Sequence, residues 1–311
     1  MLLGVLLTLS GCFKEDFSFC PLDVNVNIRY ALPDGNGGCT FMRDITTVTT
    51  AIFDDEGTLV QTVTTNESDH RIFQGIRVKL APGTYRLISW GNSNENTILN
   101  NLPNCYTTAN SIISYNNIVN SHVGNCDPVY YAPNTVRTAR TGNLDGEFIF
   151  TVKESKNYDG LLNFRNAHRR VEVFVKGYDV DGLTTPNIEL TGLPASLTLL
   201  GMNSIIGGNL VSAELQSHLT LVNENGKSTP YAMAPFTVFY FLAKYYDVGI
   251  NVINPKTGEI IYSTKLNDHI DPYADNPDKI VLQLVLEFKN GTVEVTVPSW
   301  DSDDVDYGIF E

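Results

Sequence analysis

Basic residues are scarce in this chain, and the shortage excludes several kinds of partner. Lys and Arg together number 21 against 35 Asp and Glu in 311 residues, which gives a net charge of −14. Phosphate backbones are bound by clustered Lys and Arg, so no nucleic-acid partner is expected. The same acidity argues against electrostatic adhesion of the whole chain to anionic lipid, so membrane attachment is expected to be covalent or inserted.

Long hydrophobic runs and catalytic signatures are lacking as well. The one long apolar stretch outside strand-like segments, residues 2–9, is too short to span a bilayer. The HExxH, GxSxG and Gly-rich phosphate-loop patterns do not occur, and the five histidines are scattered. The acidic tail after residue 300 does not follow the spacing of a calcium loop. We therefore predict no enzyme, no cofactor and no metal site.

What is present begins with an export signal and a lipidation motif. Residues 1–11 fit a signal peptide with a short apolar core, although they contain no Lys or Arg. They end in Leu9, Ser10 and Gly11 before Cys12, which resembles the bacterial lipobox, where small residues fit the peptidase cleft and the thiol becomes a thioether to diacylglycerol. One acyl chain holds weakly and several hold firmly, so we predict anchoring in the outer membrane through palmitate-type chains on Cys12.

Residues 12–20 form the predicted lipidated tether. Lys14, Glu15 and Asp16 resemble the signal that sends Bacteroidetes-type lipoproteins to the outer face of the membrane. The alternative is an ordinary solvated charge run. We expect the folded part to be exposed at the cell surface.

Cysteine is scarce, and its distribution suggests bridges in the N-terminal half. Beyond Cys12, four cysteines remain, and all precede residue 130: Cys20, Cys39, Cys105 and Cys126. An even number in an exported chain suggests two disulfides with three possible pairings, whereas free buried thiols are the alternative.

The rest of the sequence predicts short strands and tight turns. Apolar residues alternate over 24–30 and 76–80, and residues 46–63 predict a hairpin. Pro82-Gly83 fits a type II turn in which Gly supplies a positive φ, and Asn290-Gly291 predicts a type I′ hairpin.

Two halves follow from this pattern. Residues 92–135 form an Asn-rich excursion without regular alternation, and a boundary near residue 160 separates two sets of about seven strands. We predict an N-terminal β-sandwich over 21–160 and a C-terminal β-sandwich over 161–311.

Only two tryptophans occur, and each closes an alternating run. Exposed Trp90 and Trp300 would be able to stack on sugars, whereas buried tryptophans of a sandwich core are the commoner case.

Order and spacing of several segments are similar to a known family over essentially the whole chain. CFKEDFSFCP, VNVNIRY, VTTAIFDDEGTLV and VKLAPGTYRLISWGN, followed by LLNFRNAHRRVEVFVKG and GTVEVTVPSW, resemble the FimB/Mfa2 family of Bacteroidetes fimbrial anchor subunits. The resemblance implies an all-β chain with two transthyretin-like Greek-key β-sandwich domains in tandem. It further implies a non-enzymatic anchor that joins a fimbrial shaft subunit by strand complementation and helps limit fimbrial length.

Two other functions stay open at this point. A fimbrial tip or accessory subunit would share the same architecture. A surface glycan-binding lipoprotein would use the same tether, with the two tryptophans as stacking platforms.

Overall fold

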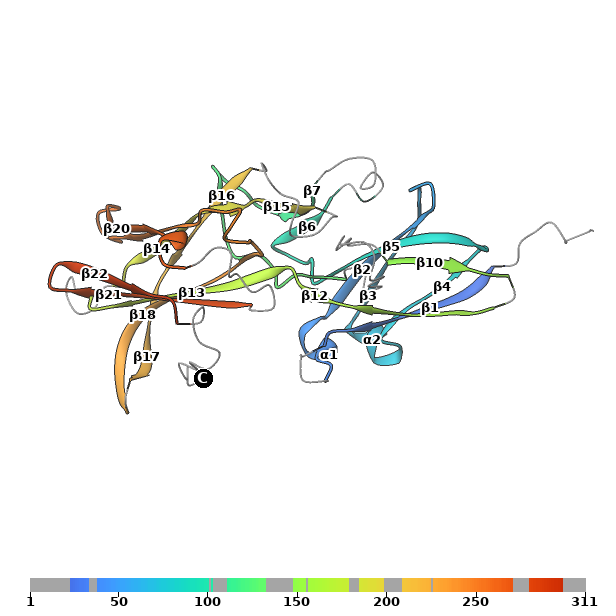
Figure 1. Ribbon diagram of the computed structural model, residues 1–311, viewed down its shortest axis with the longest axis horizontal. Coiled ribbons are helices and arrows are strands. Elements are labelled where there is room, and N and C mark those ends of the chain that lie inside the picture. Colours follow the sequence, from blue (N-terminus) through green and yellow to red (C-terminus); the bar gives the residue numbers. More distant parts are fainter. Residues whose placement is uncertain are drawn as a thin grey trace, which may run out of the picture.

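The computed structural model describes residues 23–33, 38–100, 102, 111–132, 148–154, 156–178, 185–198, 209–224, 226–270 and 280–298. Strands dominate these residues, and the described helices are short: α1 (Phe41–Asp44), α2 (Glu67–Ile72) and the 3₁₀ turn η3 (Leu266–Asp268). The predicted all-β class is confirmed. Figure 1 shows two groups of strands side by side along the long axis of the molecule.

The first group consists of two facing sheets with the orders β11-β1-β4 and β12-β9-β5-β2-β3, and β10 also pairs with β5. Their strands are β1 (Val24–Ala31), β2 (Thr47–Asp54), β3 (Leu59–Asn66), β4 (Gly75–Leu80), β5 (Gly83–Gly91), β9 (Tyr130–Tyr131), β10 (Phe148–Val152), β11 (Tyr158–Asn163) and β12 (Arg165–Asn166). Val26 and Ile28 of one sheet belong to the same buried cluster as Ile52 and Leu87 of the other. The group is therefore a sandwich, held by apolar side chains that alternate along each strand.

The second group also consists of two facing sheets, with the orders β17-β18-β13-β21-β22 and β20-β19-β14-β16-β8. Their strands are β8 (His122–Val123), β13 (His168–Lys176), β14 (Asn187–Pro194), β16 (Leu210–Gln216), β17 (His218–Glu224), β18 (Lys227–Phe239), β19 (Gly249–Ile253), β20 (Ile260–Lys265), β21 (Val281–Lys289) and β22 (Thr292–Thr296). Val173 and Leu284 of the first sheet share a core with Ile188 and Ile250 of the second.

The two groups have a common pairing scheme. In the first, β1 pairs in parallel with β11 and antiparallel with β4. In the second, β13 pairs in parallel with β21 and antiparallel with β18. The predicted tandem of sandwiches agrees with this repetition, and the transthyretin-like subtype stays a prediction. The boundary expected near residue 160 falls within β11, which still belongs to the first group.

The Asn-rich excursion connects the two groups. It contributes β6 (Thr97–Leu99) and β7 (Ser111–Tyr115), which form a small sheet with β15 (Ser196–Thr198) of the second group. It also contributes β8, which pairs with β16, and β9, which pairs with β5. Residues that read as irregular in the sequence therefore hold strands of both groups together, above the junction in Figure 1.

One sheet is buried on both of its faces because of this excursion. Ile52 and Leu87 face the core of the first sandwich. Ala51, Phe53 and Trp90 face the other way and belong to the core that continues into the second group. Strands that are covered on both sides read as continuous apolar runs, which explains the AIF and ISW segments of β2 and β5.

The turns agree with the sequence at one hairpin and differ at another. Asn290 and Gly291 have φ values of 52° and 79° between β21 and β22, so the predicted type I′ geometry is confirmed. The predicted positive φ at Gly83 is wrong, because Gly83 is already the first residue of β5 and pairs with Val152 of β10. Pairing with β10 therefore fixes the backbone conformation of Gly83.

Helix α2 was not predicted, although its start signal is present in the sequence. The Asn66 side chain accepts hydrogen bonds from the backbone N–H groups of Ser68 and Asp69, and the Asp69 carboxylate accepts one from the N–H of Asn66. This reciprocal capping box satisfies donors that a short helix leaves open.

Candidate functional site

The predicted anchoring residues lie outside the described part of the chain. This holds for the lipobox with Cys12 and for the charged triplet that starts at Lys14. Lipidation and surface export therefore stay predictions. Among the described residues, no helix has the length and hydrophobicity needed to cross a membrane.

Two of the four cysteines with possible bridges can be placed. Cys39 is exposed and Cys126 is buried, and both are free thiols in the structure. Burial, and secondly the charge of Asp127, raise the pKa of the Cys126 thiol far above its usual range. Cys126 therefore behaves as a small apolar core residue, as in the free-thiol alternative, and neither thiol supplies a disulfide here. Cys20 and Cys105 lie outside the described residues.

Trp90 is a core residue. Its side chain is 3% exposed, and its ring packs at 5.9 Å from that of Tyr131. A ring at this depth presents no face to a surface glycan. Trp300, the other candidate, lies outside the described residues.

The described histidines and acidic residues do not assemble a metal site. No group of three or more His, Cys, Asp or Glu within the described ranges is arranged to hold an ion. His122 reaches Glu189 at 3.4 Å, while His70 and His168 are buried. These contacts are pairwise and structural in kind.

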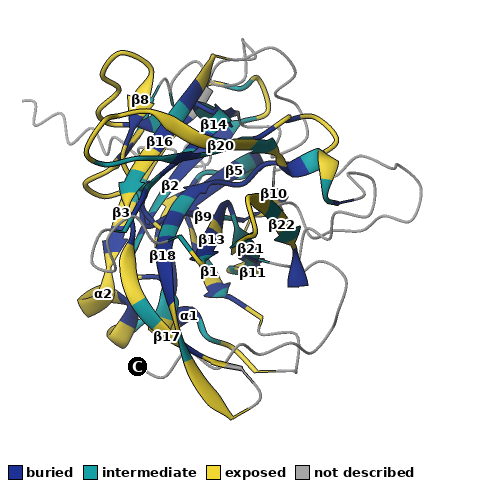
Figure 2. Ribbon diagram, turned by 90° about the vertical axis from the view of Figure 1, so that its left-hand side faces the viewer, coloured by how far each residue is buried: buried dark blue, intermediate teal, exposed yellow. Residues whose placement is uncertain are grey.

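The strongest candidate for an interaction site is the hairpin of β17 and β18, which projects from the second group of strands (Figures 1 and 2). Leu219 and Leu221 of β17 are 61% and 63% exposed, although they point to the side of the sheet that elsewhere faces the core. Leu221 lies opposite Pro230, which is also exposed. The hairpin extends beyond the facing sheet. The apolar side chains on its inner side are therefore not covered by any described residue of that sheet.

The backbone edge of β17 adds to this surface. In the described part of the chain β17 pairs only with β18, so its second edge has unpaired N–H and C=O groups. Its sequence, HLTLVNE, contains none of the Lys, Arg or Pro residues that commonly block edge strands. An extended segment of another chain would find both backbone partners and apolar contacts there.

Two other edge strands, β4 and β20, carry charged side chains. β4 carries Arg77 and Lys79, both exposed. At the end of β20 the Lys265 ammonium donates a hydrogen bond to the Asp247 carboxylate, and this bond raises the pKa of Lys265. Charges of this kind oppose pairing with an apolar strand. β20 still exposes Ile260 and Ile261, so it is the natural comparison for β17.

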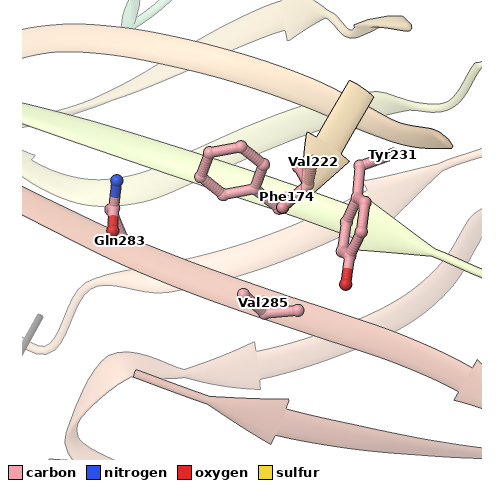
Figure 3. A pocket seen from close by; sticks show the side chains of 5 residues that line it. All are labelled: Phe174, Val222, Tyr231, Gln283 and Val285. Atoms are coloured by element: carbon pink, nitrogen blue, oxygen red, sulfur yellow. The ribbon is translucent and has the colours of Figure 1, made fainter. Parts of the chain in front are cut away.

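The outer face of the same five-stranded sheet carries an apolar cluster beside the hairpin. Phe174, Val222, Tyr231 and Met233 form it, with Val285 packed against them. Figure 3 shows Phe174, Val222, Tyr231 and Val285 around a small pocket that Gln283 also lines. With Leu219 and Leu221 on its other side, the hairpin is therefore apolar on both of its faces.

Polar groups close the far end of this cluster. The buried Glu172 carboxylate accepts a 2.6 Å contact from Nε of Arg170 and a 2.9 Å hydrogen bond from Nε2 of Gln283. A buried charge that is paired in this way links two neighbouring strands, β13 and β21, through their side chains. The candidate site therefore consists of a packed sheet face and the exposed edge of β17 beside it.

Sequence reasoning missed this surface. The signal was present, since Leu219, Leu221 and Val222 lie just before Asn225-Gly226, a second Asn-Gly turn sequence. What no pattern reveals is that the facing sheet ends before it reaches the hairpin.

The described residues form an all-β chain with stacked sandwiches and an open apolar edge, an architecture that is common among structural and binding proteins. The family of fimbrillin-A associated anchor proteins Mfa1 and Mfa2 matches residues 18–306 of this chain. The chain belongs to this family. The suspected resemblance is confirmed.

Solved structures share the fold at low sequence identity. The fimbrial anchor protein Mfa2 from Porphyromonas gingivalis matches with a TM-score of 0.64 and 16% identity, over 89% of this chain and 98% of that one. A DUF1812 protein from Bacteroides thetaiotaomicron VPI-5482, named as a candidate polysaccharide-binding protein, matches with 0.65 and 10%, over 89% and 96%. A candidate adhesin from the same strain matches with 0.62 and 12%, over 90% and 97%. A comparison with curated proteins gives no match.

Proposed function

We propose that this chain is an outer-membrane lipoprotein that anchors a fimbria to the cell surface and helps limit its length. The observation that carries the proposal is membership of a family of fimbrial anchor proteins over nearly the whole chain. The lipobox at Cys12 supplies the membrane attachment, and the short tether leads directly into β1. The sandwiches supply a stiff body that bears load, because their strands are joined across two continuous cores.

The fimbrial shaft subunit joins this body by strand complementation at the β17 edge. An extended segment pairs with the open backbone of β17, and its alternate side chains cover Leu219 and Leu221. Burying two half-exposed leucines contributes about 2–3 kcal/mol before the cost of ordering the segment. The donor segment is therefore expected to carry apolar residues at alternate positions on the side that meets these leucines.

The decisive experiment is copurification of the shaft subunit with the tagged, full chain from cells that assemble the fimbria. Leu219→Lys with Leu221→Lys places two charges on the proposed edge, and Ile260→Lys with Ile261→Lys places two on the edge of β20. All four positions are exposed, so both variants are expected to fold. We expect the β17 variant to lose the shaft subunit and the β20 variant to retain it.

The outcomes separate the two parts of the proposal. Retention by both variants would remove β17 as the acceptor edge and leave the anchor function standing. Absence of any fimbrial subunit from the wild-type preparation would remove the anchor function. Cys12→Ala tests the tether independently: the chain should leave the membrane fraction yet still bind the shaft subunit.

A further inference from the structure

The outer face of the three-stranded sheet gathers cations that are dispersed in the sequence. Arg29 of β1 and Arg77 and Lys79 of β4 alternate with core residues and point to this face, where all three are exposed. The register places Arg77 opposite Asn27, and Arg29 two pairs further along the same strands, opposite Gly75. Within the described chain, none of the three cations takes part in an ion pair. A net charge of −14 conceals this local arrangement.

An aromatic ring holds the two guanidinium groups in place. The Phe73 ring lies 4.0 Å from the guanidinium carbon of Arg77 and 5.9 Å from that of Arg29. Stacking of this kind orients an arginine while it leaves the N–H donors free for an anion. The guanidinium groups of Arg29 and Arg77 are therefore positioned by the fold, and Lys79 is placed on the same face by the register of β4.

Exposed apolar side chains border these cations. Ile72, next to Phe73 at the end of α2, is 82% exposed, and Leu161 of β11, directly opposite Arg29, is 48% exposed. Cations beside exposed aliphatic groups are the combination by which proteins lie on a charged membrane interface.

One exposed acidic residue lies on this face, and several others gather at one end of the sandwich. Asp23, Asp54 and Asp55 lie close enough to Tyr85 for their charges to raise its pKa, after the larger effect of burial, and they define the end from which β1 starts. On the face itself the register places Asp159, whose carboxylate accepts a 2.9 Å hydrogen bond from Nδ2 of Asn27. An anionic membrane would thus repel the end of the sandwich and attract its broad face.

We propose that this face, formed by Arg29, Arg77, Lys79, Ile72 and Leu161, binds the anionic headgroups of the membrane in which the chain is anchored. The idea rests on the proposed lipid anchor in one respect: from Cys12 to Val24 the tether spans at most about 40 Å, so the face stays close to the lipid. At the effective concentration that such a tether gives, a weak attraction is enough to set the orientation of the body.

The test uses the mature chain from residue 12 with Cys12→Ala, which carries no acyl group, and flotation with vesicles. Vesicles of phosphatidylethanolamine with phosphatidylglycerol are compared with vesicles in which neutral phosphatidylcholine replaces the phosphatidylglycerol. We expect binding to the anionic vesicles alone, and a steep loss when salt shortens the screening length. Arg29→Gln with Arg77→Gln and Lys79→Gln should weaken binding roughly 30- to 100-fold.

Matched variants separate a specific face from net charge and from misfolding. Lys227→Gln with Lys244→Gln and Lys289→Gln removes the same charge from exposed positions of the second group and should leave binding unchanged. Arg29→Lys with Arg77→Lys keeps the charge and should retain most of it. Equal binding by the first triple variant and the wild type, equal binding to neutral vesicles, or no binding at all would overturn the proposal. None of these results depends on lipidation or on the shaft subunit, so each leaves the anchor function to its own test.

Discussion

The hydroxyl of Thr97 donates a 2.6 Å hydrogen bond to Oδ2 of Asp127, a residue that lies 30 positions later in the chain. The same carboxylate oxygen accepts the backbone N–H groups of Thr97 at 3.0 Å and of Asn94 at 2.9 Å. Asp127 is buried. One carboxylate therefore joins the start and the end of the excursion between β5 and β9, which packs against the second group of strands.

Loss of this carboxylate should destabilise the whole chain. Asp127→Ala leaves the buried N–H and hydroxyl of Thr97 without an acceptor and removes the bonds from Asn94 and Asn96, so we expect the free energy of unfolding to fall by about 3 kcal/mol. Urea unfolding followed by tryptophan fluorescence measures the change. Asp159→Ala is the control, because this carboxylate is exposed and its loss should cost less than about 0.5 kcal/mol. Similar losses for the two variants would contradict the role assigned to Asp127.

The contrast between strands and excursion shows what the sequence can predict. Val24 to Tyr30 alternate with period two, and the structure has a strand there because one face is buried and the other is solvated. Asn290-Gly291 predicted its turn because few residues tolerate positive φ. These features depend on neighbours in the sequence, so they can be read from it.

Features that depend on distant residues could not be read in this way. Nothing near Asp127 indicates that its partners are Thr97 and Asn94, and nothing near Leu219 indicates that the facing sheet ends short of it. Arg29 and Arg77 lie 48 positions apart in the sequence, yet the antiparallel register of β1 and β4 brings both to the ring of Phe73. Tertiary packing decides all three, and the candidate surfaces follow from it.

Gly75 should be irreplaceable at the start of β4. Its φ is +153°, and a Cβ atom there would lie 2.0 Å from the carbonyl oxygen of Ile28. Because the obstacle is backbone, Gly75→Ala is expected to cost about 3 kcal/mol or to prevent folding. Gly226→Ala, at φ +79° with open space around the Cβ position, should cost about 1 kcal/mol. Thermal unfolding of both variants measures the difference, and equal melting temperatures would contradict it.

The two free thiols should differ sharply in reactivity. Cys39 is exposed, whereas burial raises the pKa of the Cys126 thiol and blocks access to it. We expect iodoacetamide at neutral pH to alkylate Cys39 in the native chain and Cys126 only after denaturation. Mass spectrometry of the two peptides, with and without denaturant, measures this. Rapid native alkylation of Cys126 would show that the core around it opens.

Acid should weaken the fold before the carboxylates titrate, because two histidines are buried in neutral form. His168 donates from Nδ1 to the carbonyl oxygen of Val129 at 2.9 Å, and His70 bonds to the hydroxyl of Thr65 at 2.8 Å. Burial lowers the pKa of both imidazoles below the ordinary value of 6.5. The unfolded chain therefore binds protons in a pH range where the folded chain does not, and stability falls as the pH drops below about 6.5.

The size of this effect and its origin can be measured together. Each histidine lowers the free energy of unfolding by at most about 1.4 kcal/mol per pH unit between the unfolded and the folded pKa. Urea unfolding at pH 7.5 and pH 5.5 should give a clear drop for the wild type, and a smaller one for His168→Asn, whose amide can still donate to Val129. His218→Asn, at an exposed position, is the control. If the free energy of unfolding of His168→Asn falls between pH 7.5 and pH 5.5 as much as that of the wild type, the acid sensitivity belongs to other groups.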